Sequence, residues 1–461
     1  MENNKYKAKI DKFAQDFETD KTSYIEDWKH FLSFKSISAD PAFHEDCIDC
    51  AKWLTTYFEK LNFKVELIET ESKPLVYAEY IKDKSLKTIL FYGHYDVQPV
   101  DPLDLWKSDP FKAEIRNERL YARGAVDNKG QVMYFLKALE NALKSDLLNC
   151  NVKILIEGEE ESGSKAISTA LPGISEKIQA DVLMVCDTGT LSEQFATITM
   201  GLRGILSLEV RLDGAAYDLH SGVHGGVVPN PGTSIAKLVA TLHDKDGKIA
   251  VDGYYDSVAP VDPEDMKLAN GMPFDIKMYE AQVGVEACGG EQGRSLFDRR
   301  GFRPTLEVNG IYSGYMGPGG KTIIPSYAIA KISARLVAGQ DPDASMKLIK
   351  DHLLKYAPKG LKMSFNYNEI GGPALSLSSK APIIAKAKQL LDSICEQETA
   401  FMWEGASVPI VPGLAKYSGA TPILVGFSME EDSIHAPNES FGIEQFRKGF
   451  LYASLMLSSL E

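Results

Sequence analysis

The chain has 461 residues and 44% hydrophobic content, which is enough to fill more than one core, so two domains are the natural expectation. The formal net charge of −14 argues against nucleic acid or an anionic membrane as a partner, because phosphate binding needs a basic face. The N-terminal sequence has no apolar leader-like region, and no stretch reaches the roughly 18 apolar residues of a membrane span. We therefore expect a cytoplasmic protein that binds neither membrane nor nucleic acid.

Helix and strand patterns in the first 200 residues predict an α/β domain. A helix-like stretch at 45–61 contains Cys47-x-x-Cys50, which has no second pair for zinc and is better explained as half-buried helix thiols. Residues 123–130 open a helical pattern that runs to about residue 144. Apolar runs that predict buried strands lie at 88–93, 152–156 and 182–186.

Polar residues follow each of these strands. His94-x-Asp96 closes the first run, Glu160 and Glu161 lie in the acidic cluster after the second, and Asp187 follows the third. In an open α/β sheet, residues beyond the carboxyl ends of strands converge on one crevice. Unpaired carboxylates buried there would cost several kcal/mol. Two divalent cations would resolve the repulsion.

Each of these residues also has an ordinary structural interpretation. Taken singly, Asp127 is a helix cap at the start of the helical pattern that runs to about residue 144, Glu160 a solvated loop carboxylate, and His435 a satisfied loop histidine. Taken jointly, they favour a metal site. His-x-Asp is also the common arrangement in which a carboxylate orients a ligating imidazole, although Asp96 would reach only the far ring nitrogen of His94.

A long insertion separates these motifs from His435. Residues 201–376 are expected to form a second domain, a small α+β sandwich, between catalytic segments 1–200 and 377–461. Its predicted elements are strands at 205–212 and 327–336 and helices at 234–242 and 344–356. After the insertion, a helix at 381–395 and a buried strand at 422–427 precede His435.

Four motifs in this order resemble the M20 metallopeptidases, closest to the carnosinase-like dipeptidase branch. They lie at 93–99 (Gly-His-Tyr-Asp-Val-Gln-Pro), 123–130 (Arg-Gly-Ala-Val-Asp-Asn-Lys-Gly), 157–164 (Glu-Gly-Glu-Glu-Glu-Ser-Gly-Ser) and 219–222 (Leu-His-Ser-Gly). The resemblance extends from about Trp28 to the C-terminus and includes the late His435. It implies a mixed-sheet, di-metal catalytic domain with an inserted lid or dimerisation domain.

The resemblance also assigns roles at the metal centre. Asp127 would bridge two divalent ions, zinc or manganese, with a cis peptide bond after it. His94 and Asp187 would complete one site, and Glu161 and His435 the other. A water bridging two cations is acidified by both, and Glu160, left unligated, would take its proton as general base.

In the inserted domain, the resemblance implies residues that act on the substrate. His220 matches a histidine that dimeric members pass across the subunit interface to polarise the scissile carbonyl, so a homodimer is expected; without the family, His220 is a turn residue beside Gly222. Arg335 and the loops containing Thr322 and Ser407 match positions that hold the carboxylate of a peptide substrate. From the sequence alone, Arg335 is equally well a surface ion-pair residue.

Three functions remain open at this point. The first is a dipeptidase acting on unblocked L-dipeptides, and the second is an N-acyl amino acid deacylase, of desuccinylase or deacetylase type, that uses the same two metals. The third, a binding protein without catalysis, would require a substitution at Glu160 or a ligand, and none is present. Gly189 stands where carnosinase-like relatives often have an aromatic residue, so carnosine itself is not assumed as the substrate.

Overall fold

The computed structural model describes residues 5–405 and 408–460, and the chain divides into two compact units. The first unit contains residues 1–200, 377–402 and 410–461, and the second contains residues 201–376 and 403–409. The second unit is therefore inserted into the first. Segment 403–409 groups with the inserted unit, whereas we expected everything after residue 376 to belong to the catalytic domain.

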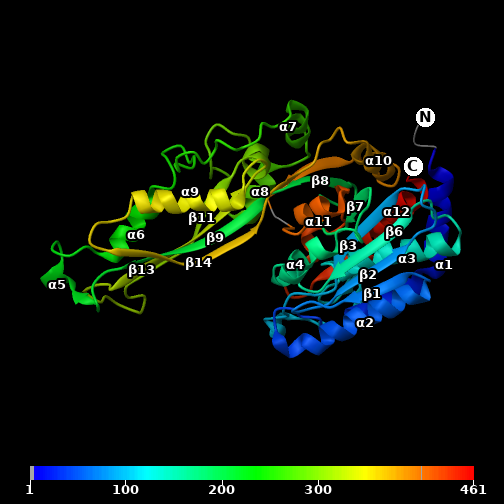
Figure 1. The fold of residues 1–461 in the computed structure, drawn as a ribbon, viewed down its shortest axis with the longest axis horizontal. Helices are drawn as coiled ribbons and strands as arrows, with labels where there is room; N and C mark the ends of the chain where they lie inside the picture. The colour runs from blue at the N-terminus through cyan, green and yellow to red at the C-terminus, as the bar shows by residue number, and fades with distance from the viewer. Residues whose placement is uncertain (1–4, 406–407, 461) are drawn as a thin grey trace. The chain divides into compact units, whose positions relative to one another are not determined.

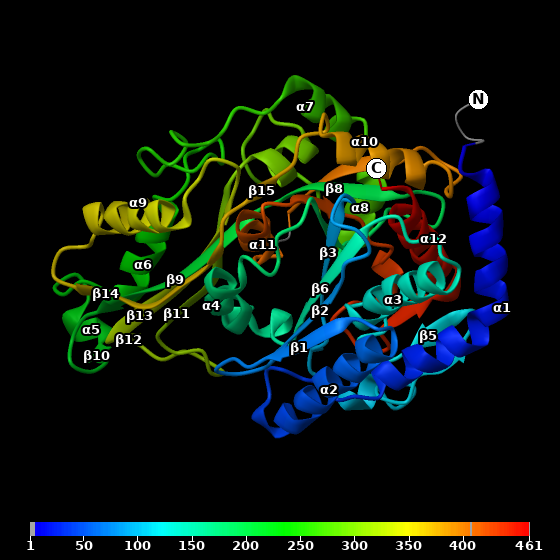
Figure 2. The same cartoon turned by 45° about the vertical axis from the view of Figure 1, so that its right-hand side comes forward.

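The first unit contains most of a nine-stranded mixed sheet, several strands of which are labelled in Figure 2. The order is β1-β2-β6-β3-β7-β17-β8-β15, with β16 also paired with β8, and the residues of β15 and the ends of β8 and β16 fall in the second unit. The four central strands β6, β3, β7 and β17 are parallel, and antiparallel strands flank them. This mixed α/β architecture confirms the expected fold class. The bounds are β1 Lys64–Ile68, β2 Leu75–Tyr80, β3 Thr88–His94, β6 Asn151–Glu157, β7 Val182–Val185, β8 Thr197–Leu202, β15 Leu375–Ser376, β16 Ala400–Glu404 and β17 Thr421–Leu424.

Helices cover the sheet of the first unit, as buried parallel strands require. α3 and α12 pack against each other and against α1, and α11 packs against α4, β7 and β17. None of the helices in the described part of the chain is long and apolar enough to cross a membrane. The bounds are α1 Lys7–Leu32, α2 His44–Lys60, α3 Lys129–Lys144, α4 Lys165–Ile174, α10 Pro382–Leu391, α11 Val411–Ser418 and α12 Ile443–Ser459.

A small three-stranded sheet joins the C-terminal segment to the loop before α3. β18 (Ser440–Gly442) pairs with β5 (Arg119–Tyr121), which pairs with β4 (Glu114–Arg116). Beyond this pairing, the Ala122 amide donates to the Glu439 carbonyl over 3.1 Å. The loop that carries His435 is thereby held beside the loop that carries Asp127.

The second unit contains a four-stranded antiparallel sheet with the order β11-β13-β9-β14 (Figure 1). β9 and β13 alternate strictly between buried and partly exposed residues, and helices α6 and α9 pack on the sheet. The core between them is aliphatic. The bounds are β9 Gly204–Asp213, β10 Leu219–His220, β11 Thr305–Ser313, β12 Ile323–Ile324, β13 Tyr327–Leu336, β14 Lys362–Gly372, α5 Ser221–His224, α6 Pro231–Ala240, α7 Pro263–Asn270, α8 Ile276–Val283 and α9 Pro342–Lys355.

Candidate metal centre and active site

The carboxyl ends of the parallel strands bring the acidic motifs together. His94 is the last residue of β3, and Asp187 follows β7 by two residues. Glu160 and Glu161 form a 3-10 turn (Glu160–Ser162) just beyond β6. Asp127 precedes α3, and the peptide bond that follows it is cis. Local sequence therefore places each side chain at one edge of one sheet, as the topology of such sheets leads us to expect.

Two groups of metal-ligating side chains share Asp127. One group comprises His94, Asp127 and Asp187, and the other Asp127, Glu161 and His435. Asp127 Oδ1 lies 3.3 Å from His94 Nε2, whereas Asp127 Oδ2 lies 3.0 Å from His435 Nε2. Each carboxylate oxygen of Asp127 thus faces a different group, which is the arrangement a bridging ligand needs.

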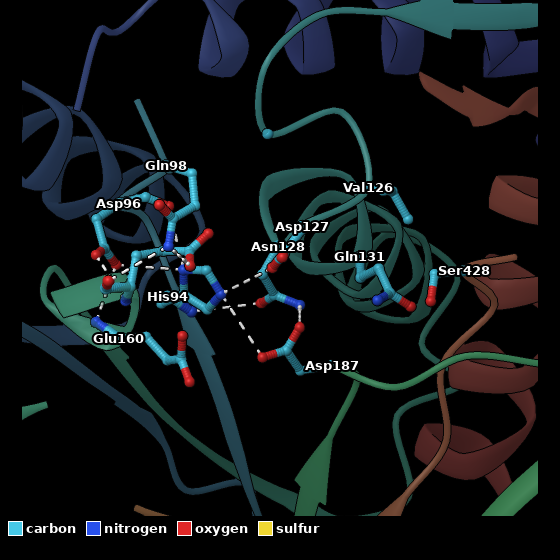
Figure 3. A network of polar contacts seen from close by, with 12 residues as sticks. His94, Asp96, Gln98, Val126, Asp127, Asn128, Gln131, Glu160, Asp187 and Ser428 are labelled. Atoms are coloured by element: carbon cyan, nitrogen blue, oxygen red, sulfur yellow. Dashed lines mark hydrogen bonds and ion pairs between the residues drawn. The ribbon is translucent and has the colours of Figure 1, made fainter. Parts of the chain in front are cut away.

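The remaining distances complete the two groups. His94 Nε2 lies 3.6 Å from Asp187 Oδ2, and His435 Nε2 lies 3.2 Å from Glu161 Oε2. Figure 3 shows the first group, with His94 between Asp96 on one side and Asp127 and Asp187 on the other. The side chain of Glu160, though close by, belongs to neither group.

The charges of the cluster are unbalanced. Burial, reinforced by neighbouring carboxylates, raises the pKa of Glu160 well above its usual range and raises that of Glu161 to about 7. The neighbouring imidazoles of His435 and His94 lower the pKa of Asp127, although burial opposes them. Hydrogen bonds to Asp127 and Glu161 in turn raise the pKa of His435 to about 10. The protein alone supplies more negative charge here than it neutralises.

The residues fit a pair of divalent cations. His94 Nε2 is fully buried and makes no hydrogen bond of normal geometry, so the nitrogen that faces the carboxylates has its lone pair available. Each group offers one imidazole and two carboxylates, a donor set that suits zinc or manganese. A cation in each group would also offset the repulsion among the carboxylates.

Asp96 connects the imidazole to the loop of glutamates. Its Oδ1 lies 3.2 Å from His94 Nδ1, the ring nitrogen that faces away from the other ligands. The same carboxylate accepts hydrogen bonds from the Glu160 amide at 3.2 Å, the Glu161 amide at 3.1 Å and the Ser38 hydroxyl at 2.6 Å. Asp96 thus orients a ligand histidine and fixes the backbone of Glu160 and Glu161 with one side chain.

Sequence reasoning overlooked two amides that hold ligand carboxylates. Gln98 Nε2 donates to Glu161 Oε2 over 2.8 Å, and Asn128 Nδ2 donates to Asp187 Oδ1 over 2.9 Å. Both residues lie within the motifs given above: Asn128 directly follows the ligand Asp127, and Gln98 lies two positions after Asp96. A side-chain amide so close to a ligand in the sequence could have predicted a hydrogen bond to a ligand carboxylate.

Glu439 is the third residue that was overlooked. Its fully buried carboxylate accepts hydrogen bonds from the amides of Gly124, Val126 and Asp127 at 2.9, 3.0 and 3.1 Å, and from Arg123 Nη1 at 2.8 Å. Because Glu439 lies four residues after His435, it ties the loops of two ligands together. No local sequence pattern predicts this contact, because it joins residues more than 300 positions apart.

The remaining predicted residues lie in the inserted unit. His220 Nδ1 accepts a hydrogen bond from the Gly222 amide at 3.0 Å, and His220 pairs with Ile323, the residue after Thr322, between β10 and β12. Arg335 lies near the end of β13. Ser407 lies outside the described residues.

A mixed α/β sheet that presents two histidine–carboxylate groups around one shared aspartate, with a further buried glutamate beside them, defines a hydrolase of the two-metal class. The model of peptidase family M20/M25/M40 matches residues 90–458, and the chain belongs to that family. It is a metallopeptidase, as the four motifs predict.

Individual relatives cover almost the whole chain. The Cys-Gly metallodipeptidase dug1 of Schizosaccharomyces pombe is 28% identical over 462 residues, covering 96% of each chain. The structure of an M20 family metallo-carboxypeptidase, Sso-CP2 from Sulfolobus solfataricus, superposes with a TM-score of 0.83 at 31% identity, covering 94% of this chain and 98% of the other. Human carnosine dipeptidase 1 superposes with a TM-score of 0.77 at 26% identity, covering 97% and 99%.

Proposed function

We propose that the enzyme hydrolyses the peptide bond of short unblocked peptides, chiefly dipeptides. The observation that carries the proposal is the pair of ligand groups that share Asp127, with Glu160 buried beside them but outside both. The relatives support peptides as substrates, because the names of those compared above include two dipeptidases.

Two divalent ions, zinc or manganese, would acidify a water molecule and polarise the scissile carbonyl. Glu160 accepts the proton of the attacking water and passes it to the leaving amine. Burial favours the acceptance of the proton, because it raises the pKa of Glu160 and stabilises the protonated carboxyl. Asp96 holds the far nitrogen of His94 and the backbone amide of Glu160, so the base keeps its position beside the ligands.

The inserted unit would supply the substrate contacts. We assign Arg335 to the substrate carboxylate because a guanidinium fork matches a carboxylate bidentately, with Thr322 and Ser407 as further contacts. We assign His220 to the scissile carbonyl, acting from the partner subunit of a homodimer. The pairing of His220 with the residue after Thr322 supports a common role, because a small two-stranded sheet brings these two distant segments together.

We also propose that the enzyme works in the cytoplasm. All six cysteines are free. Reduced thiols are usual in the cytosol, where glutathione and thioredoxin prevent stable disulfides.

Two other activities would use the same centre. A carboxypeptidase acting on longer peptides is favoured by the superposition on a metallo-carboxypeptidase. An N-acyl amino acid deacylase remains the second alternative. Carnosine is not proposed as a substrate, because a Cβ at Gly189 would lie 2.9 Å from the Ser428 carbonyl oxygen, which leaves no room for the aromatic residue common in carnosinase-like relatives.

The test is amine release by metal-reconstituted enzyme from a panel of unblocked dipeptides, longer peptides, and N-acetyl and N-succinyl amino acids. Glu160→Gln serves as the blank and Glu159→Gln as the matched control. Glu159 accepts a hydrogen bond from the Ala166 amide at the start of α4 and belongs to neither ligand group. We expect turnover chiefly of dipeptides; turnover confined to acylated amino acids would overturn the proposal.

A further inference from the structure

Two arginines of the inserted unit lie side by side at one end of its sheet. Arg203 immediately precedes β9, in which Ile205 pairs with Arg335 of β13. Because successive side chains alternate between the two faces, Arg203 and Ile205 share a face, and Arg203 is the diagonal neighbour of Arg335. This face is the one opposite the aliphatic core, since the alternate residues Leu206 and Leu336 are buried within that core.

Arg203 has no anionic partner among the described residues. Its Nε donates to the Gly405 carbonyl over 3.2 Å, and no ion pair forms. The nearby Arg300, by contrast, is paired with Glu404 at 3.3 Å. Burial, and then the positive charges of Arg335 and Arg300, lower the pKa of Arg203 to about 10, although the charges of Glu307 and Glu404 oppose this shift without forming an ion pair with Arg203 among the described residues. A partly buried guanidinium beside another one is unfavourable unless an anion joins them.

Arg211, on the same face of the sheet, provides a comparison for Arg203. It lies within β9, eight residues after Arg203 and therefore on the same face of the sheet. Its guanidinium is paired with Asp213 at 2.8 Å and stacks on the Tyr327 ring at 4.1 Å. The chain thus neutralises Arg211 internally and leaves Arg203 without such a partner.

Gly405 keeps the space beside Arg203 open. A Cβ at position 405 would lie 2.8 Å from Arg203 Nη2, so any larger residue would displace the guanidinium. The Gly405 carbonyl accepts a hydrogen bond from Nε over 3.2 Å, so the remaining N–H donors of the guanidinium are those of its two Nη groups. A guanidinium held through Nε can present both Nη groups to one carboxylate.

We propose that Arg203 determines specificity together with Arg335, by binding the free C-terminal carboxylate of the peptide substrate. Two guanidinium groups around one carboxylate would make the enzyme select for peptides with a free C-terminus and against amides and esters. This inference rests on the proposed peptidase function, because it names the recognition element for that substrate.

The test compares Arg203→Ala, Arg203→Lys and the control Arg211→Ala, each with full metal content and an unchanged thermal melt, on a dipeptide and on its C-terminal amide. We expect Arg203→Ala to raise the KM for the free dipeptide about ten- to hundredfold, with kcat nearly unchanged and hydrolysis of the amide unaffected. Arg203→Lys should recover part of the loss, because it restores the charge without the fork. Equal effects on both substrates, or no effect on KM, would overturn the inference.

A binding measurement separates this inference from the proposed function. Calorimetry with L-leucine and L-leucinamide requires no turnover, and the wild type should bind the carboxylate compound more tightly. If no peptide is hydrolysed but Arg203→Ala abolishes that preference, the peptidase proposal fails and the role of Arg203 in binding carboxylates stands. If the preference survives in Arg203→Ala, the inference fails whatever the substrate.

Discussion

The two units of the molecule differ in how their polar residues are held. In the first unit, the ligand carboxylates and imidazoles are held by the buried Asp96 and Glu439 and by the half-buried Gln98. In the second unit, His220 is exposed and accepts a hydrogen bond from the amide of Gly222, only two residues along the chain. The side chains with the most fixed geometry thus lie in the first unit, whereas His220, which we propose acts on the substrate, lies on an exposed surface.

The largest effect is expected from removal of Asp127, the ligand that both groups share. Asp127→Ala takes one oxygen from each ligand group, so both metals and all measurable turnover should be lost. Metal content after dialysis, measured by mass spectrometry, checks the change. Retention of two equivalents would mean that Asp127 does not bridge.

Glu160→Gln separates chemistry from metal binding. Both metals should remain, while kcat falls by about 10²–10⁴-fold because proton transfer from the attacking water is lost. The measurement is kcat on a dipeptide beside the metal content of the same sample, with Glu159→Gln as control. Metal loss equal to that of Asp127→Ala would show that Glu160 is a ligand and that the base is another residue.

Glu439→Ala tests the support of the ligand loops. Four donors would lose their acceptor, including the buried Arg123, so metal affinity should fall by about 10- to 100-fold. Competition with a chelator measures the affinity. Glu431→Ala is the control, because that exposed carboxylate lies equally close to His435 in the chain but pairs with Arg119 at 2.6 Å instead of the Asp127 loop, and its effect should be about 1 kcal/mol or less of stability.

The smallest expected effect concerns the buried carboxyl of Glu157. Burial raises the pKa of Glu157 to about 8, although hydrogen bonds from Tyr92 at 2.7 Å and Ser164 at 2.9 Å oppose it. Between its ordinary value and pH 8 the folded state holds a proton that the unfolded state has lost, so the free energy of unfolding falls as the pH rises, by about 1.4 kcal/mol per unit at most.

Glu157→Gln mimics the protonated carboxyl and should remove this dependence. In chelator, the apparent Tm of the wild type should match that of the variant near pH 5 and fall increasingly below it towards pH 8. A difference in Tm that stays constant with pH would contradict a neutral Glu157.

Much of the centre was predictable because each motif directly follows its own strand or precedes its own helix. β3, β6 and β7 agree with the predicted apolar runs to within a residue or two, and β13 matches 327–336. A strand end fixes where the next two or three residues lie, so local pattern and topology together locate most of the ligand set.

What escaped prediction depends on contacts between distant segments. Glu439 reads as one more loop carboxylate, and only the pairing of β18 with β5 brings it to the amides of the Asp127 loop. The return of residues 403–409 to the inserted unit is equally non-local. Helix α10 ends at Leu391 rather than near residue 395, an error of the size usual for helix ends.

The most direct test of the two-metal account is a titration of metal-free enzyme with manganese or zinc, with bound metal and dipeptide hydrolysis followed in the same samples. The account predicts that the wild type binds two metal ions per chain and reaches full turnover only when both are bound. Glu160→Gln should also bind two metal ions per chain but show almost no turnover. Saturation at one equivalent with full turnover would contradict it.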